Sequence, residues 1–216
     1  MLFDLPSLPP KEQYKLVTST IVPRPIAWVV TLDQEGRCNA APFSFFNVLA
    51  NDPVVVGFSI GPRASGGGKD TVGNIRRTGQ FVVCLVGEDT TEAMNVTAVE
   101  FPPGVDEIAQ AGLGTLPSTR VAPPRIAESA VALECETFQT IPIGAYLLVL
   151  GRALALHVRD DCVLDAERHY IDTARLRLIG RMEAPNAYVR TTDRFEMPRI
   201  SLDAFQARRA WPPAKE

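Results

Sequence analysis

The chain has 216 residues and a formal net charge of −3, with 46% hydrophobic and 22% charged residues. These values are typical of a globular protein that buries a large core without disulfides or a structural metal. The acidic balance disfavours a nucleic-acid binder, because neutralising phosphates requires a basic surplus. No membrane association is expected, since the longest apolar stretch, 145–156, is too short to span a bilayer and the N-terminus does not resemble a signal peptide.

Most of the expected elements are strands joined by short turns. Apolar and β-branched runs predict strands over 26–32, 38–46, 53–60, 80–86, 131–138 and 146–158. The polar turn 33–37 joins the first two as a hairpin. In 131–138 the apolar side chains alternate with Glu134 and Glu136, which places both glutamates on the solvent face, whereas 146–158 is apolar on both faces and therefore central.

Helices are expected to be fewer and short. The pattern predicts them over 70–78, 89–98 with Asp89 as the N-cap, 105–111 and 201–209. Hairpin-linked strands with short helices in the loops are typical of a closed or nearly closed antiparallel barrel. We therefore expect one domain, mainly β with short helices, with a core over about 14–189, an N-terminal lead-in and a C-terminal tail.

The four cysteines and two histidines indicate no metal site and no catalytic cluster. The thiols, at positions 38, 84, 135 and 162, are scattered singly without a CxxC pair, and such thiols usually behave as small buried hydrophobes. They suit a reducing cytoplasm. No GxxxxGK[ST] or HExxH motif is present. Any chemistry is therefore expected to be carried by a bound organic cofactor.

The segment 61–74, GPRASGGGKDTVGN, has the composition of a phosphate cradle. Its three glycines at 66–68 allow the backbone to approach a ligand closely, and Lys69 supplies a flexible cation. A helix that begins at Asp70 or Thr71 has N-terminal amides that attract anions. An exposed loop followed by a capped helix explains the same residues equally well.

The segment 39–47, NAAPFSFFN, contains a proline inside a strand. Pro42 implies either an edge position or a bulge, and a bulge would turn backbone amides and the Ser44 hydroxyl toward a ligand. The small alanines leave room for a planar heteroaromatic ring, and the phenylalanines offer it flat apolar surface. Aromatic-rich strands are more often core. Arg24, held extended between two prolines, faces a phosphate or carboxylate, or is an ordinary surface arginine.

Taken in order, these segments resemble a known family. The stretch 14–56, YKLVTSTIVPRPIAWVVTLDQEGRCNAAPFSFFNVLANDPVVV, followed by 69–86, KDTVGNIRRTGQFVVCLV, is similar to the flavin reductase-like, FMN-binding split-barrel family. The resemblance runs from about 14 to about 188 and is densest between 24 and 86. It implies an antiparallel split β-barrel that forms a homodimer and holds FMN non-covalently near the dimer interface.

The resemblance also implies which residues hold the cofactor. Those expected at the isoalloxazine and ribityl groups are Ala41, Pro42, Phe43, Ser44 and Asn47. Those expected to hold or support the phosphate are Lys69, Thr71 and Asn74, and we add Arg24 as a cofactor contact. Segment 179–188, IGRMEAPNAY, is similar to the closing segment of the family, with Arg181 retained near the flavin or substrate.

The chain departs from the family pattern at two places. Glu183, Ala184 and Pro185 stand where relatives often carry paired glycines, which puts the shape of the substrate pocket in doubt. Cys84 stands where asparagine is common. The insertion 104–124 and the tail 190–216 are expected at the pocket mouth or in the subunit contact.

The implied function is an oxidoreductase in which NADH or NADPH gives hydride to the flavin. The electrons then pass to free flavin, an iron complex, a quinone, or a partner monooxygenase or electron-transfer protein. Two alternatives remain, a flavoredoxin-like carrier that a protein partner reduces and a flavin-binding module without turnover. A haem- or pyridoxine-phosphate-processing relative has no support, because neither His157 nor His169 lies in the matched motifs.

Overall fold

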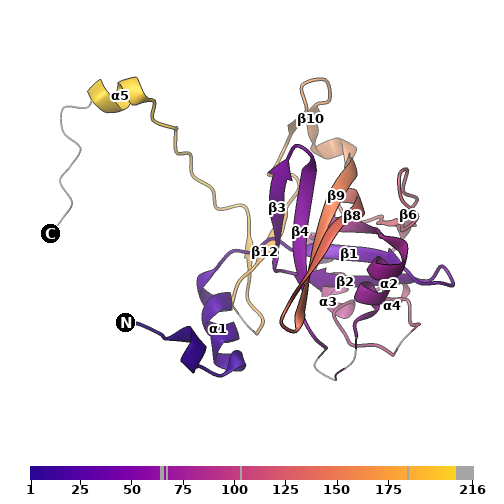
Figure 1. The fold of residues 1–216 in the computed structure, drawn as a ribbon. Helices are drawn as coiled ribbons and strands as arrows, with labels where there is room; N and C mark the ends of the chain where they lie inside the picture. Colours follow the sequence, from indigo (N-terminus) through magenta and orange to yellow (C-terminus); the bar gives the residue numbers. More distant parts are fainter. Residues whose placement is uncertain (64–65, 67, 103, 184, 208–216) are drawn as a thin grey trace.

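One curled antiparallel sheet forms the body of the molecule (Figure 1). The structure, a computed structural model, describes residues 1–63, 66, 68–102, 104–183 and 185–207. Within these residues the sheet contains seven strands, β1 (Ala27–Leu32), β2 (Cys38–Phe43), β3 (Phe46–Asn51), β4 (Val54–Ile60), β5 (Gln80–Leu85), β8 (Val131–Ile143) and β9 (Tyr146–Val158). Their order across the sheet is β2-β1-β5-β8-β9-β4-β3.

The two edges of this sheet are neighbours along the chain. β2 lies at one edge and β3 at the other, yet only Ser44 and Phe45 separate them in sequence. β1 and β2 run steeply across β3 and β4 (Figure 1), and the Ser59 N–H in β4 donates to the Phe45 carbonyl at 2.9 Å. The sheet therefore curls until its edges approach each other at residues 44–45. The expected mainly β fold with an antiparallel split barrel is confirmed.

The hairpin of β8 and β9 joins the two halves of the curled sheet. Each of its strands is 13 residues long. β8 pairs with β5 through 132–136, whereas β9 pairs with β4 through 147–152. Register shifts after Glu134 and after Thr137 interrupt the pairing between the two strands, and such irregularities bend a hairpin.

The core lies on both faces of β1, because its side chains alternate between two apolar clusters. Trp28 and Val30 pack with Met94 and Ile108 in one cluster. Val29 packs in the other cluster, which contains the aromatic side chains Phe43, Phe58 and Phe81. Burial on both faces explains why β1 is continuously apolar in sequence.

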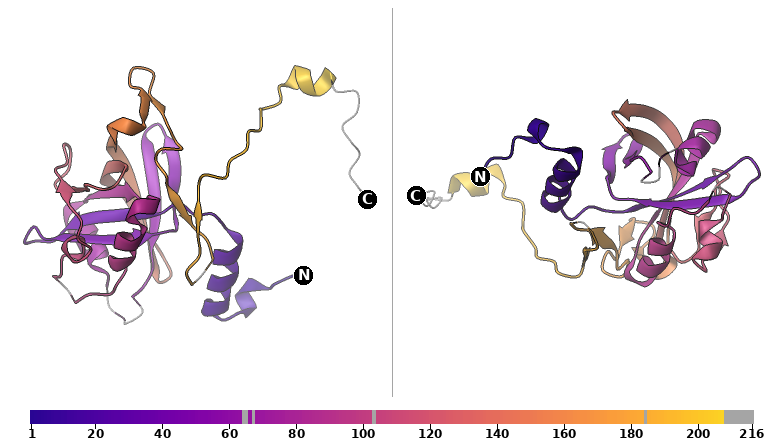
Figure 2. Two further views of the ribbon diagram at one scale, coloured as in Figure 1. Left: turned by 180° about the vertical axis from the view of Figure 1, so that it is seen from behind. Right: turned by 90° about the horizontal axis from the view of Figure 1, so that it is seen from below.

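Short helices and paired strands surround the sheet. The helices are α1 (Pro10–Thr20), α2 (Asp70–Thr78), α3 (Thr91–Val96), α4 (Glu107–Gln110) and α5 (Leu202–Ala207), with 3-10 turns at Leu5–Ser7, Glu88–Thr90 and Asp160–Cys162. The paired strands are β6 (Thr115–Leu116) with β7 (Arg125–Ile126), β10 (Val163–Asp165) with β11 (Tyr170–Ile171), and β12 (Ile179–Arg181) with β13 (Tyr188–Arg190). The chain after β13 extends away from the body to α5 (Figure 2). Among the described residues no helix has the length and apolar character needed to cross a membrane.

Several predicted elements are present, and the predicted span of one strand is wrong. β1, β5, β9 and α2 match their predicted spans to within one residue. The predicted strand 38–46 instead ends at Phe43, and a separate strand begins at Phe46 after the crossing between the two edges. The N-terminal helix α1 was not expected.

The predicted helix ends are less accurate. Asp89 is not an N-cap, because it lies inside the 3-10 turn that precedes α3. The helix expected at 105–111 is shorter, and Asp106 caps it by accepting hydrogen bonds from the Ile108 N–H at 2.9 Å and the Ala109 N–H at 3.1 Å. α5 occupies part of the predicted 201–209, whose last two residues lie outside the described residues.

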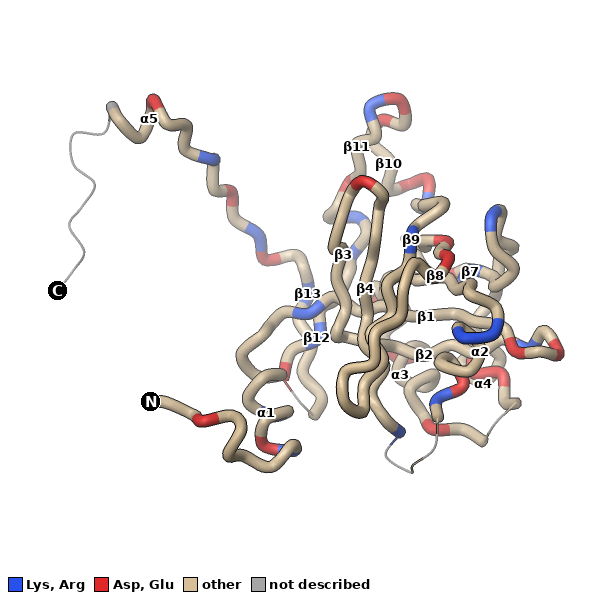
Figure 3. Tube along the Cα trace, in the orientation of Figure 1, with Lys and Arg blue, Asp and Glu red and all other residues tan. Residues whose placement is uncertain are grey.

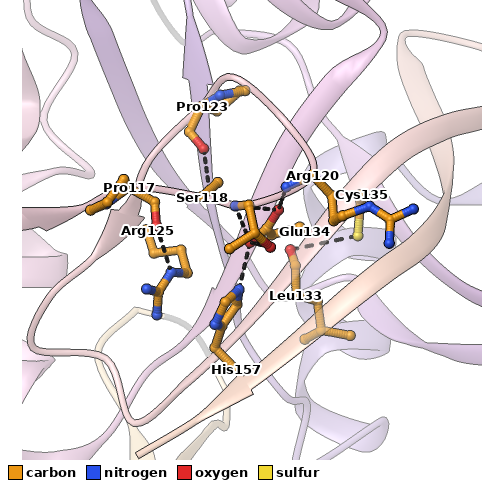
Figure 4. Close-up of polar contacts among 10 residues, drawn as sticks. Pro117, Ser118, Arg120, Pro123, Arg125, Leu133, Glu134, Cys135 and His157 are labelled. Carbon is orange, nitrogen blue, oxygen red and sulfur yellow. Dashed lines mark hydrogen bonds and ion pairs between the residues drawn. The ribbon is translucent and has the colours of Figure 1, made fainter.

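Glu134 was expected on the solvent face of β8, and this prediction is wrong. Its side chain is fully buried, because the later part of the insertion 104–124 folds over it (Figure 4). The carboxylate accepts hydrogen bonds from the Thr119 N–H at 2.9 Å and the Arg120 N–H at 2.5 Å, and it contacts His157. Glu136 does face outward, where it forms an ion pair with Arg152.

Candidate functional site: a groove along β2

The edge strand β2 presents backbone groups that the sheet does not use. Its register with β1 runs without a shift from Cys38 to Phe43, so Pro42 marks an edge position and not a bulge. The Ala40 N–H donates to a Glu107 carboxylate oxygen at 3.1 Å and therefore points away from β1. Because backbone direction alternates along a strand, the Pro42 nitrogen points the same way and the missing N–H costs no ladder hydrogen bond.

Two cavities follow this edge and together form what we call the β2 groove. The Lys69 cavity, about 200 Å³, is lined by Ala41 and Pro42 of β2 and by Lys69 and Thr71 at the start of α2. The Arg181 cavity, about 460 Å³, is lined by Pro42, Ser44, Arg181 and residues of α1 and α3. The two cavities are contiguous, because Pro42 and Ala98 border both of them.

The start of α2 brings positive charge to the Lys69 cavity. Lys69 is the N-cap residue, and its Nζ lies 5.3 Å from the centroid of the Phe43 ring. Burial lowers the pKa of Lys69. The helix ends at Gly79, whose φ of 66° is the left-handed conformation common after helices. The lysine ammonium and the positive end of the helix dipole therefore border the same small space.

A buried polar network fixes α2 against the sheet. The Thr71 hydroxyl donates to Asn39 Oδ1 at 2.9 Å, and Asn74 Nδ2 donates to the Thr31 hydroxyl at 3.0 Å. Asn39 Nδ2 in turn donates to Glu107 at 2.9 Å. Thr71 borders the Lys69 cavity, whereas Asn74 faces the sheet and supports the helix. Sequence reasoning missed Asn39 and Glu107, because no local pattern indicates their contact across 68 positions.

Glu107 is the acidic member of this network. Its side chain is 7% exposed, and burial raises its pKa although Ala40 and Asn39 donate hydrogen bonds to it. The first part of the insertion 104–124 thus borders the groove, as expected. The later part instead packs over β8.

Two residues predicted at the flavin do not line either cavity of the groove. The Phe43 side chain is 5% exposed and packs in the core, with its ring centroid 5.4 Å from that of Phe58. Asn47 is exposed on β3, and its Oδ1 accepts the Val48 N–H at 2.8 Å. It borders an apolar recess of about 300 Å³ next to Ser44.

The Arg24 guanidinium is surrounded by backbone carbonyls. Nη1 donates to the carbonyls of Thr18 at 2.8 Å and Ile21 at 2.6 Å, and Nη2 donates to the Met182 carbonyl at 2.6 Å. Its side chain is buried, and burial lowers its pKa. Arg24 therefore links the end of α1 to the β12–β13 hairpin. Its two Nη groups make these structural contacts instead of extending into the β2 groove.

The β12–β13 hairpin closes the far end of the groove. Arg181 pairs with Arg24 through its backbone, and its guanidinium carbon lies 4.6 Å from the centroid of the Tyr188 ring. Its Nη2 donates to the Pro185 carbonyl, and Pro185 lines this wall. Ala184 lies outside the described residues, as does Gly67 of the glycine run. Cys84 is buried in the core and lines neither cavity.

The curled sheet and the groove at its edge define an antiparallel split barrel. A family model described as "Flavin reductase like domain" matches residues 19–174, and the chain belongs to this family.

The relatives span nearly the whole chain. An uncharacterized protein of Deinococcus radiodurans is 44% identical over 94% of this chain and 92% of its own length. The crystal structure of Pseudomonas fluorescens 2-nitrobenzoate 2-nitroreductase NbaA is 32% identical, with a TM-score of 0.85 and coverage of 94% of this chain and 98% of that chain. Nitrilotriacetate monooxygenase component B from Bacillus cereus is also 32% identical, with a TM-score of 0.84 and coverage of 91% and 98%.

Proposed function

We propose that this chain binds FMN in the β2 groove and acts as an NADH- or NADPH-dependent flavin reductase. The observation that carries the proposal is the convergence of Lys69, Thr71 and the Pro42 edge on one small cavity, continuous with a larger one. The narrow end is lined by Lys69 and Arg63 as well as by Asp70, Glu100 and Glu107, and the wider end has mixed polarity. Cations at the narrow end and room for a planar ring at the wider end suit a ligand that has a phosphate at one end and a ring at the other. The donor set therefore fits FMN.

Each part of the groove has a distinct role in this proposal. Lys69 and the start of α2 hold the phosphate, and Thr71 and Asn74 fix that helix in place. Pro42 and the Ser44 hydroxyl orient the ring system, the small Ala41 side chain leaves room for it, and Arg181 contacts the ring or the second substrate. Bound FMN would supply the hydride-accepting and electron-donating chemistry, while the protein positions the reactants and limits access of water.

A spectrum and an anaerobic reduction test this proposal. Purified protein loaded with FMN should show oxidised flavin absorbance and tight binding by titration. Addition of NADH or NADPH without oxygen should then bleach the flavin band. Binding without bleaching by either nucleotide contradicts the reductase and favours the second candidate, a flavoredoxin-like carrier that a protein partner reduces. Binding with no electron transfer from any donor indicates a flavin-binding module.

The acceptor and the assembly belong to the same proposal. The 32% identity to a monooxygenase component B supports a partner monooxygenase as the electron acceptor. A homodimer is supported by the edge strand β3, where Val48 is 61% exposed and Leu49 is 56% exposed, since exposed apolar edges are usually covered. Four free cysteines suit the cytoplasm.

A further inference from the structure

The apolar recess beside Asn47 adjoins the β2 groove at Ser44, and the proposed FMN site does not use it. This Arg24 recess, about 300 Å³, lies between the end of α1 and the crossing that joins β2 to β3. Arg24, Ser44 and Asn47 form the polar part of its lining. The rest is apolar and consists of Val17, Ile21, Pro23, Pro25, Phe45 and Phe46. No acidic side chain of the described residues lines the recess.

Arg24 brings to this recess a buried charge without a counter-ion. Its side chain is 7% exposed, and its two Nη groups donate to three backbone carbonyls, which are neutral. The buried Nε, a further donor, has no acceptor among the described residues. Figure 3 shows basic residues at this place, where β12 and β13 lie beside the chain that follows α1. A carboxylate would satisfy both the charge and the remaining donor.

Two further donors line the same recess. The Ser44 hydroxyl is half-buried and has no hydrogen-bond partner in the part of the chain that the structure describes. The Asn47 Oδ1 accepts the Val48 N–H at 2.8 Å, which leaves the Nδ2 group of Asn47 without a described partner. The recess therefore combines donors and a cation with an apolar wall. That combination favours a ligand that has an apolar body and one anionic group.

We propose that the Arg24 recess binds a small apolar monocarboxylate. The carboxylate accepts hydrogen bonds from Ser44 and Asn47 and offsets the charge of Arg24, while the apolar body packs against Ile21 and Phe45. None of these contacts involves flavin, so the inference does not depend on the proposed function. Because Ser44 also lines the Arg181 cavity, a ligand in the recess would adjoin the proposed flavin ring.

Binding of benzoate to the full chain, measured with and without FMN, tests this site. Benzamide has the same shape without the charge, and acetate has the charge without the ring. We expect benzoate to bind in both states, at least tenfold more tightly than benzamide or acetate. Benzoate, but not benzamide, should also shift the NMR signal of the Arg24 Nε–H, because this donor lacks an acceptor in the free protein.

A change of charge at Asn47 tests the polar part of the recess. Asn47→Asp adds a carboxylate with almost no change in size, and like charges repel, so the affinity for benzoate should fall about tenfold. Benzamide binding should change less than twofold. Asn51→Asp is the matched control, because it adds the same charge on the same strand but outside the recess. Ile21→Trp, at a side chain that is 61% exposed, fills the apolar part and should weaken both ligands.

The outcomes separate this site from the flavin site. Equal affinities for benzoate and benzamide, or equal losses in Asn47→Asp and Asn51→Asp, would overturn the proposal. Benzoate binding that requires bound FMN would place the ligand on the flavin and would overturn it as well. No benzoate binding in either state rejects the recess whatever the affinity for FMN. Benzoate binding with the expected variant effects, in a protein that does not bind FMN, supports the recess and refutes only the proposed function.

Discussion

Glu134 and His157 form a polar pair beneath the insertion, with Oε1 of the carboxylate 2.5 Å from Nε2 of the imidazole. Burial alone raises the pKa of Glu134, but hydrogen bonds from Thr119, His157 and Arg120 outweigh burial and lower it to about 2. The carboxylate therefore ties the segment near 119–120 to the sheet at neutral pH.

Replacement of Glu134 by glutamine should lower the free energy of unfolding by about 2–3 kcal/mol at pH 7, because a buried acceptor of charge-assisted hydrogen bonds is lost. A carboxyl with a lowered folded-state pKa stabilises the protein fully above its unfolded value, near 4.5, and loses that contribution as the pH falls toward 2. The difference in the free energy of unfolding between wild type and Glu134→Gln, measured by urea denaturation, should become smaller as the pH falls from 4.5 toward 2.

Glu136→Gln provides the matched control on the same strand. Its exposed ion pair with Arg152 should contribute less than about 1 kcal/mol. If the difference in unfolding free energy between wild type and Glu134→Gln stays constant from pH 7 to pH 2, the assigned role of the carboxylate is contradicted.

Arg24→Lys tests whether Arg24 holds the structure or the cofactor. A lysine ammonium cannot reproduce the fork that reaches the Thr18, Ile21 and Met182 carbonyls, so we expect a loss of about 1–3 kcal/mol in stability. Faster amide exchange in α1 and in the β12–β13 hairpin should accompany it. Unchanged stability together with weaker FMN binding would instead assign Arg24 to the phosphate. Arg152→Lys, at an exposed arginine, serves as the control.

Lys69→Met separates phosphate recognition from ring recognition. Methionine keeps the apolar stem near Phe43 but removes the charge. We expect FMN binding to weaken about 10- to 100-fold, because a charge-assisted hydrogen bond to phosphate is lost. Riboflavin, which lacks the phosphate, should bind wild type and variant equally in the same fluorescence titration. Lys15→Met, on exposed α1, should change neither affinity, and equal losses for both ligands would remove Lys69 from the phosphate site.

The thiols should react slowly with alkylating reagents. Burial, with the nearby carboxylates of Asp106, Asp33 and Glu107, raises the pKa of Cys38 to about 11. Because the thiolate is the reactive form, its alkylation by iodoacetamide at pH 8 should be about 100-fold slower than that of a free thiol and should speed up with pH. Cys84 and Cys135, each with a pKa raised to about 12 mainly by burial, should react only after unfolding. Mass spectrometry of the labelled sites distinguishes these cases.

Local sequence patterns predicted the elements whose signals lie within a few residues. Both ends of α2 follow from Asp70 and Gly79, and β1 and β9 follow from their apolar runs. Glu134 was misplaced because its partners, Thr119 and His157, come from distant segments, and alternation cannot show that a loop folds back over a strand.

The candidate site was predicted in outline through the family resemblance. Sequence placed Lys69 near Pro42, and the structure brings both to one cavity. The sequence analysis also placed the Phe43 side chain against the flavin ring, but that side chain lies in the core. The sequence pattern of a strand does not show which of its two faces is turned to the core. The contacts of Arg24 could not be predicted from sequence either. Its three acceptors are backbone carbonyls, which every residue has, so no residue type indicates them.

The crossing at Ser44–Phe45 joins the two edge strands of the sheet, and Ser44 also lines the proposed binding site. A ligand bound along β2 would contact Ser44, which connects the two edge strands. Binding should therefore stabilise the folded state. A ligand at 100 times its Kd adds about 2.7 kcal/mol to the free energy of unfolding. Amide exchange should slow first at residues 44–51, where β3 has only one neighbour to hold it.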